Sequence, residues 1–166
     1  MNMLETIFES QYFIISCQML LATVFGAVIG YDREKYGKPA GVKTHSMVCL
    51  GACIIMIIGT LTAKETGYSD PNRLAAQVVS GIGFLCGGVI IVTNRSEIKG
   101  LTTAAGLWLA ACMGLCIGSS YTWICVPAGI CYYVITHIFA KAETRIKKNI
   151  KNPHTLEHDD NDKILS

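Results

Sequence analysis

The chain has 166 residues, of which 51% are hydrophobic and 16% are charged, and its net charge is +2. A soluble domain averages about 25% charged residues, so this chain has too few charges to cover a soluble surface, as its mean hydropathy of +0.41 also indicates. The composition excludes a soluble enzyme, a disordered chain and a nucleic-acid binder.

The apolar residues gather in blocks close to the length of about 20 residues that crosses a bilayer as a helix. No block contains Asp, Glu, Lys or Arg, and none shows the strict alternation of a membrane β-barrel. The sequence therefore predicts an all-α membrane protein, a compact bundle of five transmembrane helices within residues 1–140. The expected helices cover residues 11–30, 46–63, 74–93, 101–118 and 121–140.

The basic residues predict the orientation, because short cytoplasmic loops carry an excess of Lys and Arg. With the N-terminus outside, twelve basic residues fall on the inner side and only Lys64 and Arg73 on the outer side. We therefore expect the N-terminus outside and the C-terminus inside. The residues before the first block include Glu5 and Glu9 and no basic residue, which disfavours a cleavable signal peptide. Residues 141–166 are expected to form a basic juxtamembrane segment and a polar, mobile cytoplasmic tail.

All eight cysteines lie within the predicted helices. Free cysteine behaves there as a small hydrophobic residue, and the pairs four residues apart have no histidine at ligand spacing, so neither a disulfide framework nor a zinc site is predicted. We expect no cofactor, and the sequence defines no metal site.

Small residues recur at helical spacing, which allows membrane helices to approach closely. The pattern does not distinguish packing within the chain from homodimerisation, so both stay open. The predicted helix-packing residues are Gly26, Gly30, Gly83, Gly87, Gly106, Ala110, Gly114 and Gly118.

Polar residues concentrate in two places. The predicted inner loop 31–45 mixes charges of both signs and could bind a phosphate group, a partner protein or anionic lipid, although positive-inside anchoring accounts for its lysines. Either Thr44 or Ser46 could cap the helix that follows. Before the third helix, Asp70 is placed as an N-cap, and one turn separates Arg73 from Gln77. Gln77 lies within the predicted span, where an amide needs a hydrogen-bonding partner or contacts a solute.

Sequence patterns of enzymes are missing. The chain has no Walker A sequence, no nucleophile elbow and no His-Glu-x-x-His pair, and its glycines have the wrong spacing for a dinucleotide fingerprint. The sequence therefore predicts a protein that is not an enzyme.

Four ordered motifs between residues 30 and 121 resemble the MgtC/SapB family. They are the Arg33-Glu34 pair and the segments 38–45, 70–85 and 100–105. The resemblance covers the membrane domain, whereas longer members carry a soluble C-terminal domain after it. Lys43 stands where the family usually has Arg, and an ammonium cannot grip a carboxylate with two bonds as a guanidinium does.

The resemblance implies a multi-pass protein of the bacterial inner membrane, connected with growth at low magnesium and with virulence. For such proteins it implies either ion transport or control of membrane energy through a partner, the F-type ATP synthase. Mg²⁺ would be a ligand or the regulated ion. Together with the polar residues, the resemblance gives these partner- or ligand-binding candidates: Arg33, Glu34, Gly41, Lys43, Thr44, His45, Asp70, Arg73, Gln77, Ser80 and Thr102.

Two functions are predicted from these observations. The first is a regulator of Mg²⁺, ion and membrane-energy homeostasis that binds a membrane partner through its small-residue faces. The alternative is a direct transporter or channel for Mg²⁺ or another small solute, lined by Arg73 and Gln77 and working alone or as a homo-oligomer.

Overall fold

The computed structural model describes residues 3–68, 70–92, 98–119, 121–142 and 145, without side-chain detail for 3–9, 91 and 92. The chain divides into two compact units, residues 1–125 and residues 126–166.

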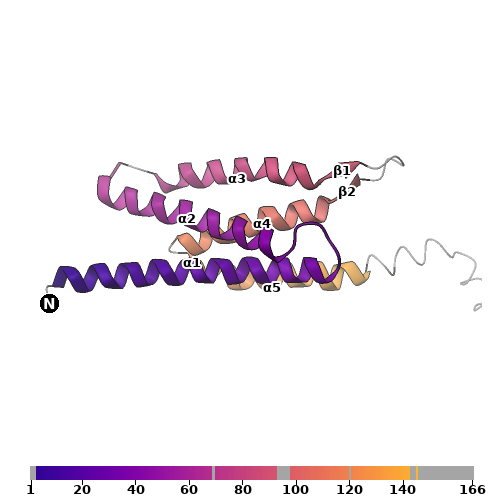
Figure 1. Ribbon diagram of the computed structural model, residues 1–166, viewed down its shortest axis with the longest axis horizontal. Helices are drawn as coiled ribbons and strands as arrows, with labels where there is room; N and C mark the ends of the chain where they lie inside the picture. Colours follow the sequence, from indigo (N-terminus) through magenta and orange to yellow (C-terminus); the bar gives the residue numbers. More distant parts are fainter. Residues whose placement is uncertain (1–2, 69, 93–97, 120, 143–144, 146–166) are drawn as a thin grey trace, which may run out of the picture. The chain divides into compact units, whose positions relative to one another are not determined.

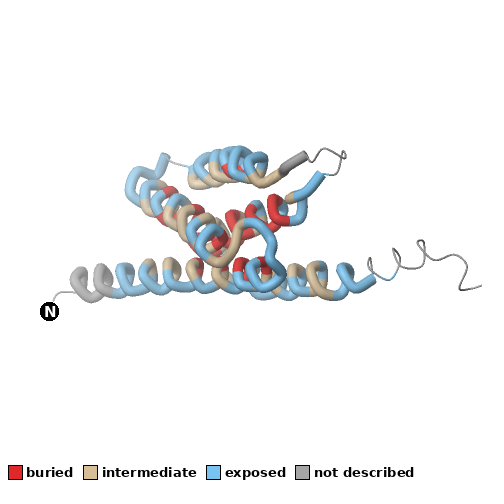
Figure 2. The backbone as a smooth tube through the Cα atoms, turned by 45° about the vertical axis from the view of Figure 1, so that its right-hand side comes forward, coloured by how far each residue is buried: buried red, intermediate tan, exposed pale blue. Residues whose placement is uncertain are grey.

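The first unit is built on four long helices: α1 (Met3–Lys35), α2 (Val42–Thr66), α3 (Pro71–Val89) and α4 (Leu101–Gly118) (Figure 1). α2 and α4 are the central pair, because α2 packs against the other three helices and α4 also packs against α1 and α3. Figure 2 shows buried residues gathered on these two helices, while α3 is mostly exposed. The largest buried side chains include Leu107, Met113 and Ile117, all of α4.

The first two helices extend beyond the apolar blocks from which they were predicted. α1 continues to Lys35, and α2 begins at Val42. Hydropathy detects only the apolar part of a helix, whereas Arg, Glu and Lys are good helix formers that continue it into the polar region. A Schellman motif ends α1: Lys38 N–H bonds Arg33 O, and Gly37, with φ of +60°, bonds Glu34 O.

The third helix ends earlier than expected. α3 stops at Val89 rather than at residue 93, and β1 (Ile91–Val92) pairs antiparallel with β2 (Ile98–Lys99). The β-branched run 89–93 favours extended backbone over helix, which explains the change. Gly100 then adopts a φ of +94°, and a Cβ at this position would collide with Val89 O.

The fifth predicted helix begins as a 3₁₀ turn, η1 (Thr122–Ile124), and continues as α5 (Cys125–Tyr133) and the π-helical η2 (Val134–Phe139). In the second unit, the rings of Tyr133 and His137 stack with their centroids 4.2 Å apart. Apart from residues 141, 142 and 145, the predicted tail 141–166 lies outside the described residues.

Four helices are long and apolar enough to cross a membrane: Ser10–Lys35, Val42–Thr66, Leu101–Gly118 and Thr122–Ala142. α3 is not among them, because Asn72, Arg73 and Gln77 lower the hydropathy of its first two turns. The fold is therefore a helical bundle of the membrane type, in which α1, α2 and α4 of the first unit are apolar enough to cross a membrane and α3 is not.

Candidate functional site

A buried arginine lies in the last turn of α1. The side chain of Arg33 is only 8% exposed, and its Nη2 donates a hydrogen bond of 2.6 Å to Oγ1 of Thr103, which is buried in the first turn of α4. The guanidinium is therefore held between α1 and α4 by a hydrogen bond to a neutral hydroxyl. Burying a cation is costly, and such a hydrogen bond offsets part of that cost.

A buried histidine lies beside it in the first turn of α2. His45 is fully buried, and both its backbone N–H and its Nδ1–H donate to the carbonyl oxygen of Gly41, at 3.2 and 3.0 Å. Because a carbonyl only accepts, Nδ1 carries the proton, and in the neutral ring Nε2 carries the lone pair. Nε2 points toward α4, where a Cβ added to Gly106 would lie 3.4 Å away. Because Gly106 has no side chain, the imidazole of His45 fits against α4 at this position.

Nε of Arg33 and Nε2 of His45 are buried and find no hydrogen-bond partner among the described residues. A buried unsatisfied donor or acceptor costs about 1–3 kcal/mol, and ionisable residues inside a membrane protein often mark function. We call Arg33, Gly41, His45 and Thr103 the polar cluster, and it is the candidate functional site.

Glu34 holds the start of α2 from outside that helix. Its Oε2 accepts the Val42 N–H at 3.0 Å. The cap predicted at Thr44 or Ser46 is wrong, because α2 already begins at Val42, and Ser46 Oγ instead donates to Thr23 O in α1. The carboxylate thus ties the end of α1 to the beginning of α2.

The other candidates on the polar-cluster side are exposed. Lys43 and Thr44 are exposed on α2, and Thr102 is exposed on α4. Sequence reasoning singled out Thr102 and missed its neighbour Thr103. The helical period carried the signal, since Thr103 shares a face with Gly106, Ala110 and Gly114, whereas Thr102 does not.

The candidates of α3 form a separate set. Asp70 is the N-cap, and its Oδ1 accepts the Asn72 N–H at 2.9 Å. Arg73, Gln77 and Ser80 are exposed along one side of the helix. The sequence-based candidates therefore fall into two groups, the polar cluster with its surroundings and a surface of α3.

The helix-packing candidates also divide. Gly26 and Gly30 of α1 touch the backbone of α2, where an added Cβ would lie 2.6 Å from Ser46 Cα and 2.5 Å from Val42 Cα. On α4, the buried Gly106, Ala110, Gly114 and Gly118 share the face that approaches α2. Gly83 and Gly87 of α3 have open space where a Cβ would stand.

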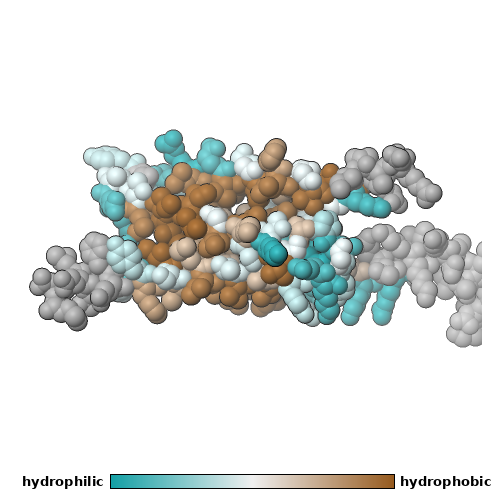
Figure 3. Space-filling view, in the orientation of Figure 1, coloured by the Kyte–Doolittle hydropathy of each residue, from teal (hydrophilic) through white to brown (hydrophobic). Residues whose placement is uncertain are grey.

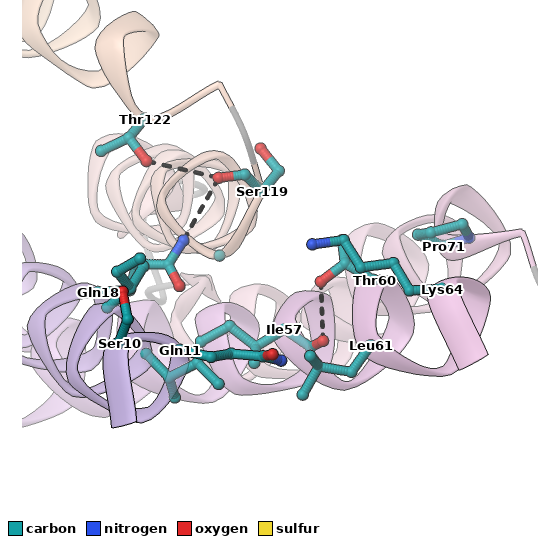
Figure 4. A pocket seen from close by; sticks show the side chains of 13 residues that line it. Ser10, Gln11, Gln18, Ile57, Thr60, Leu61, Lys64, Pro71, Ser119 and Thr122 are labelled. Atoms are coloured by element: carbon teal, nitrogen blue, oxygen red, sulfur yellow. Dashed lines mark hydrogen bonds between the residues drawn. The ribbon is translucent and has the colours of Figure 1, made fainter. Parts of the chain in front are cut away.

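A cavity of about 940 Å³ lies between α1, α2 and the end of α4 (Figure 4). Gln18 lines this cavity, and its Nε2 donates to Ile117 O at 2.8 Å and to Ser119 O at 3.5 Å. Thr122 Oγ1 donates to the same two carbonyls. These bonds satisfy carbonyl groups at the end of α4, where a helix leaves its last carbonyls without partners. Gln18 and Thr122 therefore stabilise the end of α4.

The metal-ligating side chains of the described residues are dispersed. Among the described residues, His, Cys, Asp and Glu nowhere gather in a group of three that could hold an ion. The eight cysteines are free thiols, with Cys49, Cys53 and Cys125 buried. The polar cluster offers hydrogen-bond donors and one cationic group, so it suits an anion or an acidic side chain.

Known proteins resemble the chain over most of its length. An uncharacterised protein of Haemophilus influenzae is 41% identical over 134 residues, which are 77% of this chain and 56% of that protein. YhiD of Escherichia coli (strain K12), whose name proposes it as a magnesium transporter, is 35% identical over 143 residues, 82% of this chain and 65% of YhiD. SapB of Bacillus subtilis is 39% identical over 61% of this chain and 46% of SapB.

The chain spans 56% and 65% of the length of the first two of these relatives. No solved structure matches it. A family model described as the MgtC family matches residues 19–145, which include both the polar cluster and the α3 surface. With well over half of its residues inside that match, this helical membrane protein belongs to the MgtC family.

Proposed function

We propose that the chain is a multi-pass protein of the bacterial inner membrane that regulates Mg²⁺, ion and membrane-energy homeostasis without catalysing a reaction. It acts by binding another membrane protein. In this proposal all five helices cross the bilayer, with the N-terminus outside. Membership of the MgtC family and the names of the relatives YhiD and MgtC support the connection with magnesium.

The observation that carries this proposal is the charge of the polar cluster. Mg²⁺ is a hard cation that binds oxygen ligands in near-octahedral geometry. The cluster contains instead the buried guanidinium of Arg33, while the Nδ1–H of His45 is bonded to Gly41 O and the hydroxyl of Thr103 is bonded to Arg33. A fixed positive charge repels Mg²⁺ from the interior of a single chain. This favours a regulator over a transporter.

The surface proposed for the partner lies on α3. Ala76, Ser80, Gly83 and Gly87 share one exposed side of the helix, which we call the α3 small face. A Cβ at Gly83 or Gly87 would meet nothing within 4 Å. Small residues let another membrane helix approach closely, and Ser80 supplies a hydroxyl for an interhelical hydrogen bond. The proposed occupant is a helix of a membrane protein, and the family resemblance suggests the F-type ATP synthase.

A capture experiment tests the partner. The full-length tagged chain is solubilised from membranes, and co-purified F-type ATP synthase is measured for the wild type, Gly83→Leu and Gly51→Leu. Gly51 is the matched control, because it is a glycine of α2 that also has open space. We expect Gly83→Leu to lose the synthase and Gly51→Leu to retain it. Equal capture by both variants, at equal amounts of folded protein, would contradict the α3 small face.

The alternative is a transporter that works only as a homo-oligomer. Arg73 and Gln77 are exposed on α3, so they could line a path only between copies of the chain. Mg²⁺ entry into proteoliposomes with a trapped indicator distinguishes the two functions. If the chain is a regulator, Mg²⁺ should enter these proteoliposomes no faster than it enters liposomes without protein. Entry that falls in an Arg73→Ala, Gln77→Ala double variant would establish the transporter.

A further inference from the structure

A groove runs between α2 and α3 and borders the α3 small face at Ala76, which belongs to both surfaces. It consists of two hollows, of about 360 and 560 Å³, which share Leu74 and Gln77 in their walls. The smaller hollow lies at the start of α3 and the larger one farther along the same helix. Because they meet at Gln77, one elongated ligand could occupy both.

The groove is polar at one end. Thr62, Asp70 and Arg73 line the smaller hollow. Asp70 uses Oδ1 to cap α3, and its second carboxylate oxygen retains its capacity to accept. The backbone N–H of Arg73 donates to Asp70 O at 3.1 Å, whereas the side chains of Arg73 and Gln77 make no hydrogen bond to another described residue. The polar end therefore offers one anion, one cation and one amide for an external ligand.

The other end is apolar. Ile55 and Ile58 of α2 face Ile82 and Leu85 of α3 there, and Gly81 adds no side chain to fill the space between them. Figure 3 shows hydrophobic surface over α2 and α3, with hydrophilic residues at the end where the two helices connect. The groove thus changes from charged to apolar along the direction of the helices.

The spacing of these groups matches a membrane lipid. Four residues separate Arg73 from Gln77, a rise of about 6 Å, and eight separate Gln77 from Leu85, about 12 Å. A phosphate beside Arg73 places the glycerol ester carbonyl within reach of the Gln77 amide. An acyl chain then continues along the apolar end.

The geometry points to a binding site for a glycerophospholipid whose head group carries both a phosphate and a primary ammonium, as phosphatidylethanolamine does. Arg73 binds the phosphate, the free carboxylate oxygen of Asp70 accepts from the ammonium, Gln77 donates to an ester carbonyl, and the apolar trough holds one acyl chain. The pairing of one carboxylate with one guanidinium selects this head group over an anionic one.

Lipid retention by the full-length purified protein tests the site. The protein is exchanged into nanodiscs of equal parts phosphatidylethanolamine, phosphatidylglycerol and phosphatidylcholine, and bound lipid is measured by native mass spectrometry after release. We expect the wild type to prefer phosphatidylethanolamine and Arg73→Gln to retain about fivefold less of it, the ratio expected for an exposed charge pair. Lys64→Gln, which removes an exposed cation of α2 that does not line the groove, serves as the control and should retain the wild-type amount.

Asp70→Asn tests the head group separately from folding, because Asn is also a good N-cap. It should keep the thermal midpoint and shift the preference toward phosphatidylglycerol. An unchanged preference in this variant would overturn the assignment of the ammonium to Asp70.

Gly81→Leu tests the acyl chain, since it fills the trough without touching the charges. It should reduce retention of all three lipids, and soluble glycerophosphoethanolamine should not displace the lipid from the wild type. If the free head group displaces the lipid, or if Gly81→Leu binds normally, the site binds phosphate groups and not a lipid. If the wild type is a dimer that Gly81→Leu dissociates, a second copy occupies the groove and the proposal fails.

Discussion

α3 and α4 both carry small residues at helical spacing, but only α4 uses them inside the first unit. Gly114 and Gly118 of α4 lie against the backbone of α2, whereas Gly83 and Gly87 of α3 face open space. The two helices differ in the residues around the glycines. α4 is apolar all round and is buried on most sides, while α3 exposes Arg73, Gln77 and Ser80. A small-residue stripe therefore predicts close approach, and the rest of the helix indicates whether the neighbour belongs to the same chain.

Among the substitutions that test this difference between α3 and α4, Gly114→Leu should have the largest effect on stability. A Cβ at Gly114 would collide with Cys49 O and lie 2.9 Å from Ala52 Cβ, so α4 could not keep its distance from α2. We expect a loss of about 3 kcal/mol in the free energy of unfolding and much less monodisperse protein, measured by denaturation in detergent and by gel filtration. The same change at Gly83 should lower neither property, and a loss as large there would show that the α3 small face is packed.

The next largest loss of stability is expected from a change in the polar cluster. Thr103→Val keeps the shape of the side chain but removes the oxygen that binds Arg33 Nη2. A buried charged donor is then left with one partner fewer, which should lower the free energy of unfolding by about 2 kcal/mol. Thr102→Val is the matched control on the exposed side of the same turn. Similar losses in the two variants would show that the hydroxyl of Thr103 does not stabilise α1 against α4.

Alanine substitutions at two glycines should change the stability of the protein in opposite directions. Gly26→Ala places a Cβ 2.6 Å from His45 O and should destabilise the protein by about 1.5 kcal/mol. Gly87→Ala meets nothing and should stabilise it by about 0.5–1 kcal/mol, because alanine is the better helix former. Thermal midpoints of the purified variants should move in opposite directions. Shifts of the same sign would contradict the distinction between glycines that touch a neighbouring helix and glycines that face open space.

The smallest expected effect concerns the start of α2. Glu34→Ala leaves the Val42 N–H without its acceptor, which should cost about 0.5–1 kcal/mol, the range for a lost helix cap. Glu65→Ala at the other end of α2 is the control, since Glu65 is exposed in the last turn. Chemical denaturation of both variants measures the difference, and equal free energies would mean that water replaces the carboxylate.

The sequence predicted the helical membrane class and the location of most helices, because long blocks without charges are decisive for a bilayer. It did not predict where α1 and α3 end. Hydropathy does not detect the last turn of α1, because it contains Arg33 and Glu34. It also extends the third helix too far, because residues 90–92 are apolar although they lie beyond the end of α3. Within the candidate site, Arg33 and His45 were recognised as residue types, but their burial depends on Thr103 and Gly106, which lie more than fifty residues away along the chain. Such contacts need the packing of α4 against α1 and α2.

The separation between Arg33 and its partner also affects how the protein is made. Glu34 and Val42 join α1 to α2 within eight residues, so this helical hairpin can close soon after it leaves the ribosome. The guanidinium must then wait for Thr103, seventy residues later, before its Nη2 is bonded. Until α4 packs against α1, the Arg33 side chain of a growing chain lacks this hydrogen bond. The bond can therefore form only after the first four long helices have been made.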